Sequence, residues 1–182
     1  LLGGAILMAL PGMLLWTVVA KRIGVWRALR ICMLTSAAIL LLFFLPGDFF
    51  GGLGVTAFFG LSLAGLFMLT NPLVADMVDD DELKTGARRE GLYFGMNGFI
   101  IRLAFTIQGL IAAAIFSSTG YIAPTDTVLY PEQPAAAILG MRSMIALFPP
   151  LALVIGFFLL RGYSLHGERL DELQADVAEL HE

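Results

Sequence analysis

The sequence predicts an all-α polytopic membrane protein with five membrane-spanning helices. Of its 182 residues, 58% are hydrophobic and 14% are charged, whereas a soluble domain usually has roughly 45–50% and about 25%. A chain this short cannot enclose a core large enough for that excess of apolar residues. The apolar residues also gather in long uncharged runs, and a run of about 18 or more is typical of a membrane-spanning helix.

Five segments have the length that a span requires, about 30 Å of hydrocarbon at about 1.5 Å per residue. They are residues 1–20, 28–45, 51–75, 91–118 and 135–160. The first and third carry no charge, and the second carries only Arg30, at its edge. The fourth is interrupted by Arg102 alone, and the fifth holds Arg142 in its first turns. Pro149 and Pro150 predict a kink in the fifth span.

The Lys and Arg residues predict how the helices are oriented. Nine of the eleven lie on one side of a path that alternates across the membrane, and the other two, Arg102 and Arg142, lie within spans. The opposite side has no Lys or Arg and only three acids: Asp48, Asp126 and Glu132. By the positive-inside rule, residues 76–90 and the C-terminal tail are cytoplasmic and Leu1 is outside. Because the start has no methionine and no basic n-region, we interpret it as a truncation.

The residues after Arg161 predict a short amphipathic helix. Its apolar residues recur at helical spacing among acids: Leu170, Leu173, Val177 and Leu180. We therefore divide the chain into a partial C-terminal transmembrane domain, residues 1–162, and a cytoplasmic tail helix, residues 163–182. The mostly acidic polar face does not favour anionic lipid, so we expect the tail to dock against the protein's own cytoplasmic face.

The link between the third and fourth spans, residues 76–90, is the most distinctive stretch. Its first half is acidic and its second half is basic. We interpret the acidic run as a solvated turn, because four adjacent acids cannot easily point at one metal ion. The charged groups can pair with neighbouring links and hold the helix ends in one of two arrangements. The expected cytoplasmic gate residues are Asp76, Asp79, Lys84, Arg88, Arg89, Glu90, Lys21 and Arg22.

Arg102 lies about 11 residues into the fourth span, roughly 16 Å deep at helical rise. A charge at this depth is costly and normally faces a cavity or a partner. Its helix face carries small residues, which leave room for another helix or a solute: Gly91, Gly95, Gly98, Thr106 and Gly109. We therefore expect Arg102 to face into the protein. There it can donate to a polar substrate, balance acids elsewhere in the protein, or form a structural ion pair.

Two other polar features lie near the ends of spans. Thr70, Asn71 and Pro72 lie near the inner end of the third span, where Pro72 either kinks the helix or opens it beside a cavity. Arg142 lies near the outer end of the fifth span, where it can snorkel to the surface or pair with an acid of the outer links.

No pattern in the sequence predicts an enzyme, a metal site, a cofactor or a nucleic-acid partner. Cys32 is the single cysteine, and both histidines, His166 and His181, lie in the tail. The glycine-rich links lack a phosphate-binding pattern, and no span carries a paired acid and base or a set of metal ligands.

One stretch resembles the signature between helices 10 and 11 of the melibiose-carrier-like glycoside–pentoside–hexuronide:cation symporters. It reads Ala75-Asp76-x-Val78-Asp79-x-Asp81-Glu82-Leu83-Lys84-Thr85-Gly86-x-Arg88-Arg89-Glu90-Gly91-x-x-Phe94-Gly95. The likeness continues in Gly120-Tyr121, Leu139-Gly140-x-Arg142, Pro149 and Tyr163-x-Leu165, and covers essentially the whole chain. Proteins of this family belong to the major facilitator superfamily, with twelve helices in two pseudo-symmetric halves. The resemblance implies that the five spans are helices 8 to 12.

The same resemblance implies a solute site. Arg102 takes the place of a helix-11 lysine found near the sugar and cation sites. Asn97 and Gly98 fall where polar residues line the sugar cavity, and Phe67 falls where a helix-10 tryptophan lies near the sugar. With Thr70 and Asn71 these are the expected substrate-binding residues. No cofactor is expected, and the coupling cation, Na⁺ or H⁺, is expected to bind mainly in the N-terminal half, outside this sequence.

We therefore expect part of a secondary active transporter, multi-pass in the cell (inner or plasma) membrane. It would carry out cation-coupled symport of a sugar or glycoside by alternating access. Its expected partners are that small molecule, the lipid bilayer and the N-terminal half of the same protein. Two alternatives stay open: a major facilitator transporter of a non-sugar organic solute or lipid, and a membrane sensor that binds solute without moving it. Arg102 would suit an anionic group such as a hexuronate or a phosphate.

Overall fold

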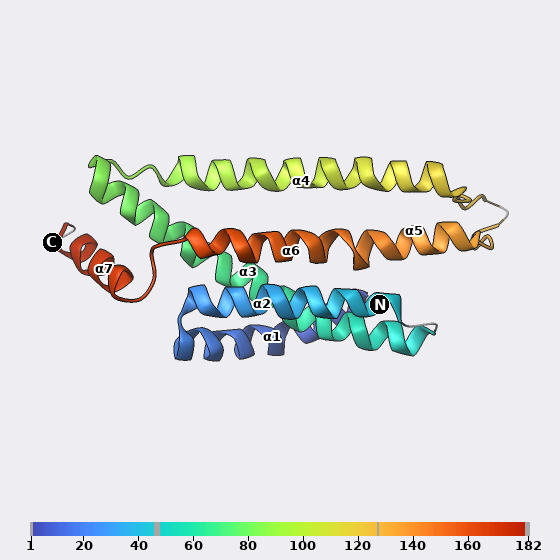
Figure 1. Ribbon diagram of the computed structural model, residues 1–182, viewed down its shortest axis with the longest axis horizontal. Helices are drawn as coiled ribbons and strands as arrows, with labels where there is room; N and C mark the ends of the chain where they lie inside the picture. Colours follow the sequence, from blue (N-terminus) through green and yellow to red (C-terminus); the bar gives the residue numbers. More distant parts are fainter. Residues whose placement is uncertain (1, 46–47, 127, 181–182) are drawn as a thin grey trace.

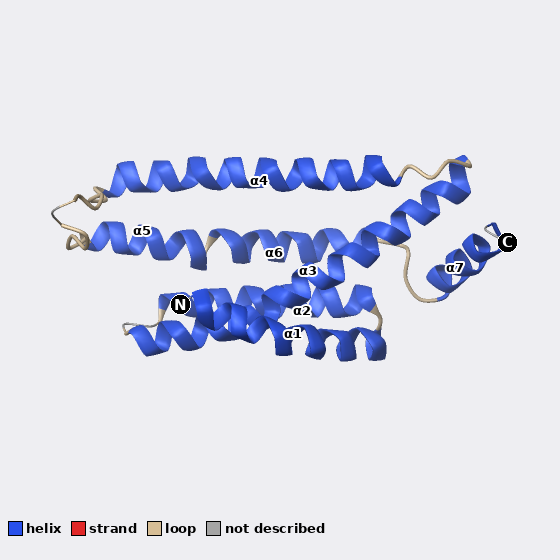
Figure 2. Ribbon diagram, turned by 180° about the vertical axis from the view of Figure 1, so that it is seen from behind, coloured by secondary structure: helices blue, strands red, loops and turns tan. Residues whose placement is uncertain are grey.

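The computed structural model describes residues 2–45, 48–126 and 128–180, and all regular structure in these ranges is helical (Figure 2). Leu1 and His181, whose positions the sequence predicts, lie outside the described residues. The α-helices are α1 (Leu2–Ile23), α2 (Val25–Leu41), α3 (Phe49–Thr85), α4 (Glu90–Thr119), α5 (Ala135–Ala146), α6 (Phe148–Leu159) and α7 (Glu168–Leu180). Short 3₁₀ turns at Leu42–Phe44 and Leu160–Gly162 extend α2 and α6.

The five predicted spans are confirmed as five helical segments long and apolar enough to cross a membrane. They are α1, α2 with its 3₁₀ turn, α3, α4, and α5 together with α6. Their connections alternate between the two ends of the bundle (Figure 1). The links α1–α2, α3–α4 and α6–α7 meet at one end, which we name the basic end because it holds nine of the eleven Lys and Arg residues.

Helix α3 is much longer than predicted, and the interpretation of the acidic run as a turn is wrong. The helix has 37 residues and includes Asp79 to Glu82 and Lys84. Between Leu73 and Thr85 there is no glycine or proline to end it, and Lys84 pairs with Asp80 one turn earlier. The helix ends at Gly86, where a positive φ of 68° is accessible to glycine at low cost.

The prolines of the two long spans have different effects. Pro149 and Pro150 follow a break at Leu147 (φ −120°, ψ −56°) that separates α5 from α6, which confirms the predicted kink. Neither proline has the backbone N–H that would continue the helical hydrogen bonding. Pro72 lies within α3, which continues through it as a helix. Of the two alternatives for Pro72, a kink or an opening of the helix, the opening is not found.

Helices α1 and α3 pack closely because the glycines at their contact have no side chain. A Cβ atom added to Gly12 would lie 2.6 Å from the carbonyl oxygen of Leu61, and one added to Gly60 would overlap the backbone of Ala5. Trp16 of α1 closes the same contact by donating from Nε1 to the Leu61 carbonyl at 3.1 Å. Such close approach of small residues is typical of packing between membrane helices.

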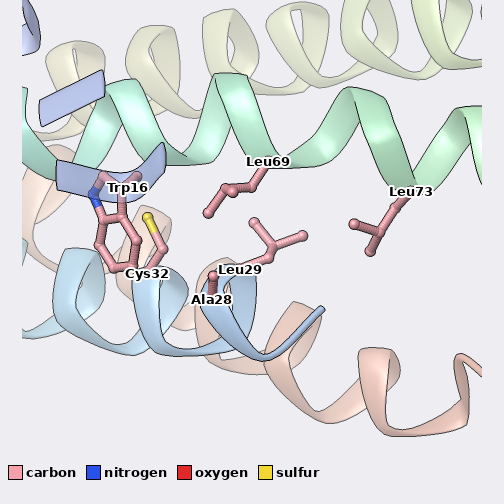
Figure 3. Packing of buried hydrophobic residues seen from close by; sticks show 6 residues of the cluster. All are labelled: Trp16, Ala28, Leu29, Cys32, Leu69 and Leu73. Carbon is pink, nitrogen blue, oxygen red and sulfur yellow. The ribbon is translucent and has the colours of Figure 1, made fainter. Parts of the chain in front are cut away.

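The core lies where α2 joins this pair (Figure 3). Its buried residues come from α1, α2 and α3: Trp16, Ala28, Leu29, Cys32, Leu69 and Leu73. The thiol of Cys32 donates to the Ser62 carbonyl at 3.2 Å, so this polar atom is satisfied inside the core. Helix α6 packs on the other side of α2, and α4 packs mainly on α5.

The predicted tail helix is present and docks against the rest of the protein. Helix α7 packs against α3 and buries Leu173, while its acidic residues face outward. The strap before it, residues 163–167, buries Leu165 and turns at Gly167 with a φ of 63°. The tail therefore covers part of the basic end.

Candidate transport site and charged gate

The sharp reversal between α3 and α4 brings the acidic and basic halves of residues 76–90 together. Gly86 donates its N–H to the Glu82 carbonyl at 2.8 Å, and α4 begins four residues later at Glu90. Arg88 and Arg89 therefore lie beside the last turns of α3. We name residues 76–90 the gate segment.

Arg88 contacts three carboxylates of the gate segment. Its Nη1 atom donates to Oδ1 of Asp79 at 3.2 Å and to Oε2 of Glu82 at 2.6 Å. Its Nε atom lies 3.6 Å from Oε2 of Glu90. Glu82 is a buried residue, and its side chain is only 12% exposed. The hydrogen bond that Arg88 donates to Glu82 raises the pKa of the guanidinium above its ordinary value, so Arg88 stays charged.

Arg89 forms the most regular pair of the gate segment, a bidentate contact with Asp81. Its Nε donates to Oδ2 at 2.8 Å and its Nη2 donates to Oδ1 at 2.6 Å. Two parallel hydrogen bonds of this kind fix the orientation of both groups. Here too the hydrogen bond to the carboxylate raises the pKa of the guanidinium. The charged groups thus fasten the start of α4 to the end of α3.

The pairing differs from the prediction in one respect. We expected the gate residues to pair with neighbouring links, but the pairs join residues of the gate segment to one another. Lys21 and Arg22 are exposed, and among the described ion pairs neither takes part. The physical reason is the helical continuation of α3, which brings the acids beside Arg88 and Arg89.

Asp76 has a different partner, the tail. The hydroxyl of Tyr163 lies 3.3 Å from Oδ2 of Asp76 and 3.3 Å from the Leu73 carbonyl. Burial raises the pKa of the Tyr163 hydroxyl, and the neighbouring Asp76 carboxylate raises it further. Tyr163 thus remains protonated and donates to α3.

A cavity of about 290 Å³ lies beside this contact, between the α1–α2 link, Leu73 and Asp76 of α3, the strap and the start of α7. Trp26 and His166 both line it, and their rings stack with centroids 4.1 Å apart. Sequence reasoning did not assign roles to Trp26, Tyr163 or His166. The available signal was the position of two aromatic residues just beyond the ends of spans, where they can anchor helices at a membrane interface.

On α3 the expected substrate-binding residues share one open face. Phe67, Thr70 and Asn71 follow the spacing i, i+3, i+4, and Phe67 is 72% exposed. Thr70 donates its hydroxyl to the Leu66 carbonyl at 2.6 Å. The opposite face of α3 holds the buried Leu69 and Leu73. The face that carries Phe67 is thus open to a solute or to another helix.

On α4, Gly98 and Arg102 share a helix face that no described residue covers, and Asn97 lies on another face. A Cβ atom added to Gly91, Gly95, Gly98 or Gly109 would find nothing within 4 Å. Asn97 is partly buried and Arg102 is exposed, and within the described residues no ion pair involves Arg102. No described hydrogen bond joins the α3 and α4 residues. The inward orientation of Arg102 therefore stays a prediction.

Arg142 lies at the opposite end of the bundle from the gate segment. Its Nη1 atom lies 3.4 Å from the Phe44 carbonyl, at the end of the 3₁₀ turn that follows α2. Arg142 thus ties α5 to the end of the second span, α2 with its 3₁₀ turn.

The family is decided by a sequence comparison. A family model described as MFS/sugar transport protein matches residues 1–167. The chain belongs to this family. Members of this family are transporters of the major facilitator superfamily.

Individual relatives of this MFS chain are similar over part of their length. It is 30% identical over 129 residues to an uncharacterized symporter, YjmB, of Bacillus subtilis, which covers 70% of this chain and 26% of that protein. It is 33% identical over 105 residues to a glucuronide carrier protein homolog of Escherichia coli (58% and 22%). It is 31% identical over 131 residues to a putative sulfoquinovose importer of Salmonella typhimurium (68% and 24%). The chain matches about a quarter of the length of these relatives.

Proposed function

We propose that this chain forms the C-terminal part of a secondary active transporter that moves a sugar or glycoside together with Na⁺ or H⁺. The observation that carries the proposal is the ion-paired gate segment between two spans of an MFS protein. The nitrogen–oxygen distances in these ion pairs are short, but the arginine side chains are partly exposed, Arg88 by 44% and Arg89 by 46%. Exposed pairs are worth roughly 0–1 kcal/mol each, so they can break and re-form during transport.

The gate segment and the tail lie on the cytoplasmic side in this proposal. Nine of eleven Lys and Arg residues lie at the basic end, and such a bias marks the cytoplasmic side of a bacterial or eukaryotic membrane protein. The membrane would be the cell membrane. Alternating access would then open and close this end by moving helix ends relative to the other half of the protein.

The C-terminal wall of the solute site consists of the open faces of α3 and α4. Phe67 offers a ring that can stack on a sugar face, and Asn97, Thr70 and Asn71 offer hydrogen-bonding groups. Gly98 leaves room for the solute beside Arg102. The coupling cation binds mainly in the other half of the protein, because the five spans predicted for this chain carry no acidic residue.

Within this class, an acidic sugar is the substrate that Arg102 fits best. Arg102 is the only charge in the apolar part of α4, and a guanidinium can bind a carboxylate or sulfonate through two parallel hydrogen bonds. Two of the relatives are named as a glucuronide carrier homolog and a putative sulfoquinovose importer, and both sugars carry an acidic group. Both names support an anionic substrate for this chain.

Uptake into sealed vesicles tests the proposal. The whole protein that contains this chain is reconstituted, and a panel of neutral sugars, glycosides, hexuronates and sulfonated sugars is offered with a sodium gradient, a proton gradient or no gradient. We expect accumulation of an acidic sugar that depends on one of the gradients.

Two results would contradict it in different ways. Gradient-driven accumulation of neutral sugars alone would remove the role of Arg102 in recognising an anionic group but keep the symporter. Solute binding without accumulation, in vesicles shown to be sealed, would replace transport by sensing.

A further inference from the structure

A chain of alternating cations and aromatic rings joins α2 to the end of α6. Atom Cζ of Arg30 lies 4.6 Å from the centre of the Trp26 ring and 4.4 Å from the centre of the Phe157 ring. Atom Cζ of Arg161 lies 4.8 Å from the centre of the Phe158 ring and 5.7 Å from that of Phe157. All four distances are within the range of a cation–π interaction. Phe157 therefore brings two positive charges from two helices to one place.

The rings that orient Arg30 are themselves held in place. Trp26 donates from Nε1 to the Leu160 carbonyl at 2.9 Å, which ties the start of α2 to the end of α6. The ring of Trp26 also stacks on His166, with an angle of 18° between the ring planes. The guanidinium of Arg30 is thus positioned by its surroundings before any ligand arrives.

No acid balances these two charges in the part of the chain that the structure describes. All described ion pairs fall within the gate segment, and none involves Arg30 or Arg161. The Nε atom of Arg30 is buried and has no hydrogen-bond partner. Arg88 and Arg89 provide the contrast, since both are engaged by carboxylates. Two guanidinium groups that both contact the Phe157 ring and form no described ion pair match the oxygens of a phosphate.

The surroundings of the two arginines are those of a lipid-facing surface. Exposed apolar side chains of α2 and α6 lie next to them in the sequence: Ile31, Leu34, Ile155, Phe158 and Leu159. Arg161 lies in the 3₁₀ turn that follows α6, and Arg30 lies in the second turn of α2. Both charges are therefore at the level where apolar helices end, which is the level of lipid headgroups.

We propose that Arg30 and Arg161 bind the phosphate of an anionic phospholipid in the leaflet at the basic end. The acyl chains lie along the exposed apolar side chains of α2 and α6, and the aromatic rings hold the guanidinium groups toward the headgroup. This site is separate from the solute face on α3 and α4. The proposal depends on the placement of the helices in a membrane. It does not depend on which solute the protein carries.

Native mass spectrometry of the whole, delipidated protein tests the proposal. The probes are phosphatidylglycerol and phosphatidylcholine with identical acyl chains, and the variants are Arg161→Gln, Arg30→Gln and the double variant. Arg161 is exposed, so Arg161→Gln keeps the test valid if Arg30→Gln disturbs folding. Arg169→Gln is the matched control, because it removes an exposed positive charge of the tail that makes no described ring contact.

We expect one phosphatidylglycerol to bind the wild-type protein in preference to phosphatidylcholine. Each arginine should contribute about fivefold to that preference, so the double variant should lose roughly 25-fold while Arg169→Gln keeps it. Equal losses in the double variant and in Arg169→Gln would show a general charge effect and overturn the proposal. Displacement of the lipid by millimolar glycerol phosphate would show a site for free phosphate, and equal binding of both lipids would show no site.

Discussion

The Tyr163 hydroxyl lies 3.3 Å from Oδ2 of Asp76, so the first residue of the tail is joined to the helix that carries the gate segment. Removing the hydroxyl with Tyr163→Phe should lower the free energy of unfolding by about 0.5–1.5 kcal/mol, the usual net value of one hydrogen bond. Thermal unfolding of the purified whole protein measures this. Tyr130→Phe is the control, because Tyr130 is 92% exposed. An equal effect of both changes would show that the contact with Asp76 contributes nothing.

If Arg102 binds the solute, replacing it should reduce transport without reducing the amount of protein inserted in the membrane. Arg102→Ala should reduce kcat/KM for uptake by at least about 30-fold, because a desolvated charge pair is worth roughly 2–5 kcal/mol. Arg102→Lys keeps the charge but not the planar fork, so it should retain part of the activity. Uptake in vesicles and the amount of inserted protein are measured together. Wild-type uptake by Arg102→Ala would exclude Arg102 from the solute site.

The bidentate pair Arg89–Asp81 predicts that the two charges can be exchanged. Arg89→Glu should slow uptake by about two- to tenfold, since it replaces an attraction of up to roughly 1 kcal/mol by repulsion. The double variant Asp81→Arg/Arg89→Glu should recover part of the rate. The comparison of single and double variants isolates the interaction of the two side chains. Failure of the double variant to recover would mean that each residue acts through a different partner.

The close packing of α1 on α3 predicts a sharp difference between two glycines of one helix. A Cβ atom at Gly60 would overlap the backbone of Ala5, whereas at Gly54 it would meet nothing within 4 Å. Gly60→Ala should therefore destabilise the protein by about 1–3 kcal/mol. Gly54→Ala should be neutral or stabilising, because alanine favours a helix. Thermal unfolding in detergent compares the two, and equal melting temperatures would show that α1 and α3 do not pack this way.

The proposed orientation predicts which engineered cysteines are accessible from each side. Ala87 and Ala123 are exposed. Ala87 belongs to the α3–α4 link and Ala123 to the α4–α5 link, and these links lie at opposite ends of the bundle (Figure 1). In a whole protein freed of other cysteines, an impermeant maleimide should label Ala123→Cys from outside the cell and Ala87→Cys only after permeabilisation. Cys32 is buried and gives little background. The reverse pattern would place the gate segment outside.

The number and path of the helices could be predicted because the bilayer imposes simple limits. Each span must be long and apolar, and the basic residues must gather at one end. The five segments within α1 to α6 are indeed long and apolar enough to cross a membrane. The kink at Pro149 and Pro150 could also be predicted, because a missing N–H acts locally.

The end of α3 could not be predicted by the same argument. Asp79 to Glu82 are too polar for a membrane span, and this polarity suggested a turn. Polarity ends a span but does not end a helix, and only Gly86 stops the helical backbone. The partner of Asp76 was missed for a related reason, since it lies 87 residues away in the sequence and depends on how the strap folds back.

The proposed solute site on α3 and α4 could be predicted only in part. Phe67 and Arg102 are placed on two helices, but no described contact brings their side chains together. The position of each on its helix follows from spacing, whereas the distance between the helices depends on what else packs against α4. The matched relatives are about four times as long as the part they share with this chain.

Helix α3 is long enough to carry the acidic part of the gate segment well beyond the membrane. At about 1.5 Å per residue, its 37 residues extend about 55 Å, well beyond a hydrocarbon core of about 30 Å. The last ten residues form a lever arm about 15 Å long that moves with the membrane-embedded part of the helix. A tilt of about 10° would therefore displace the tip by about 3 Å, which is comparable to the length of the ion pairs it carries. A small rotation of α3 within the membrane would thus displace the whole gate segment by about the length of one ion pair.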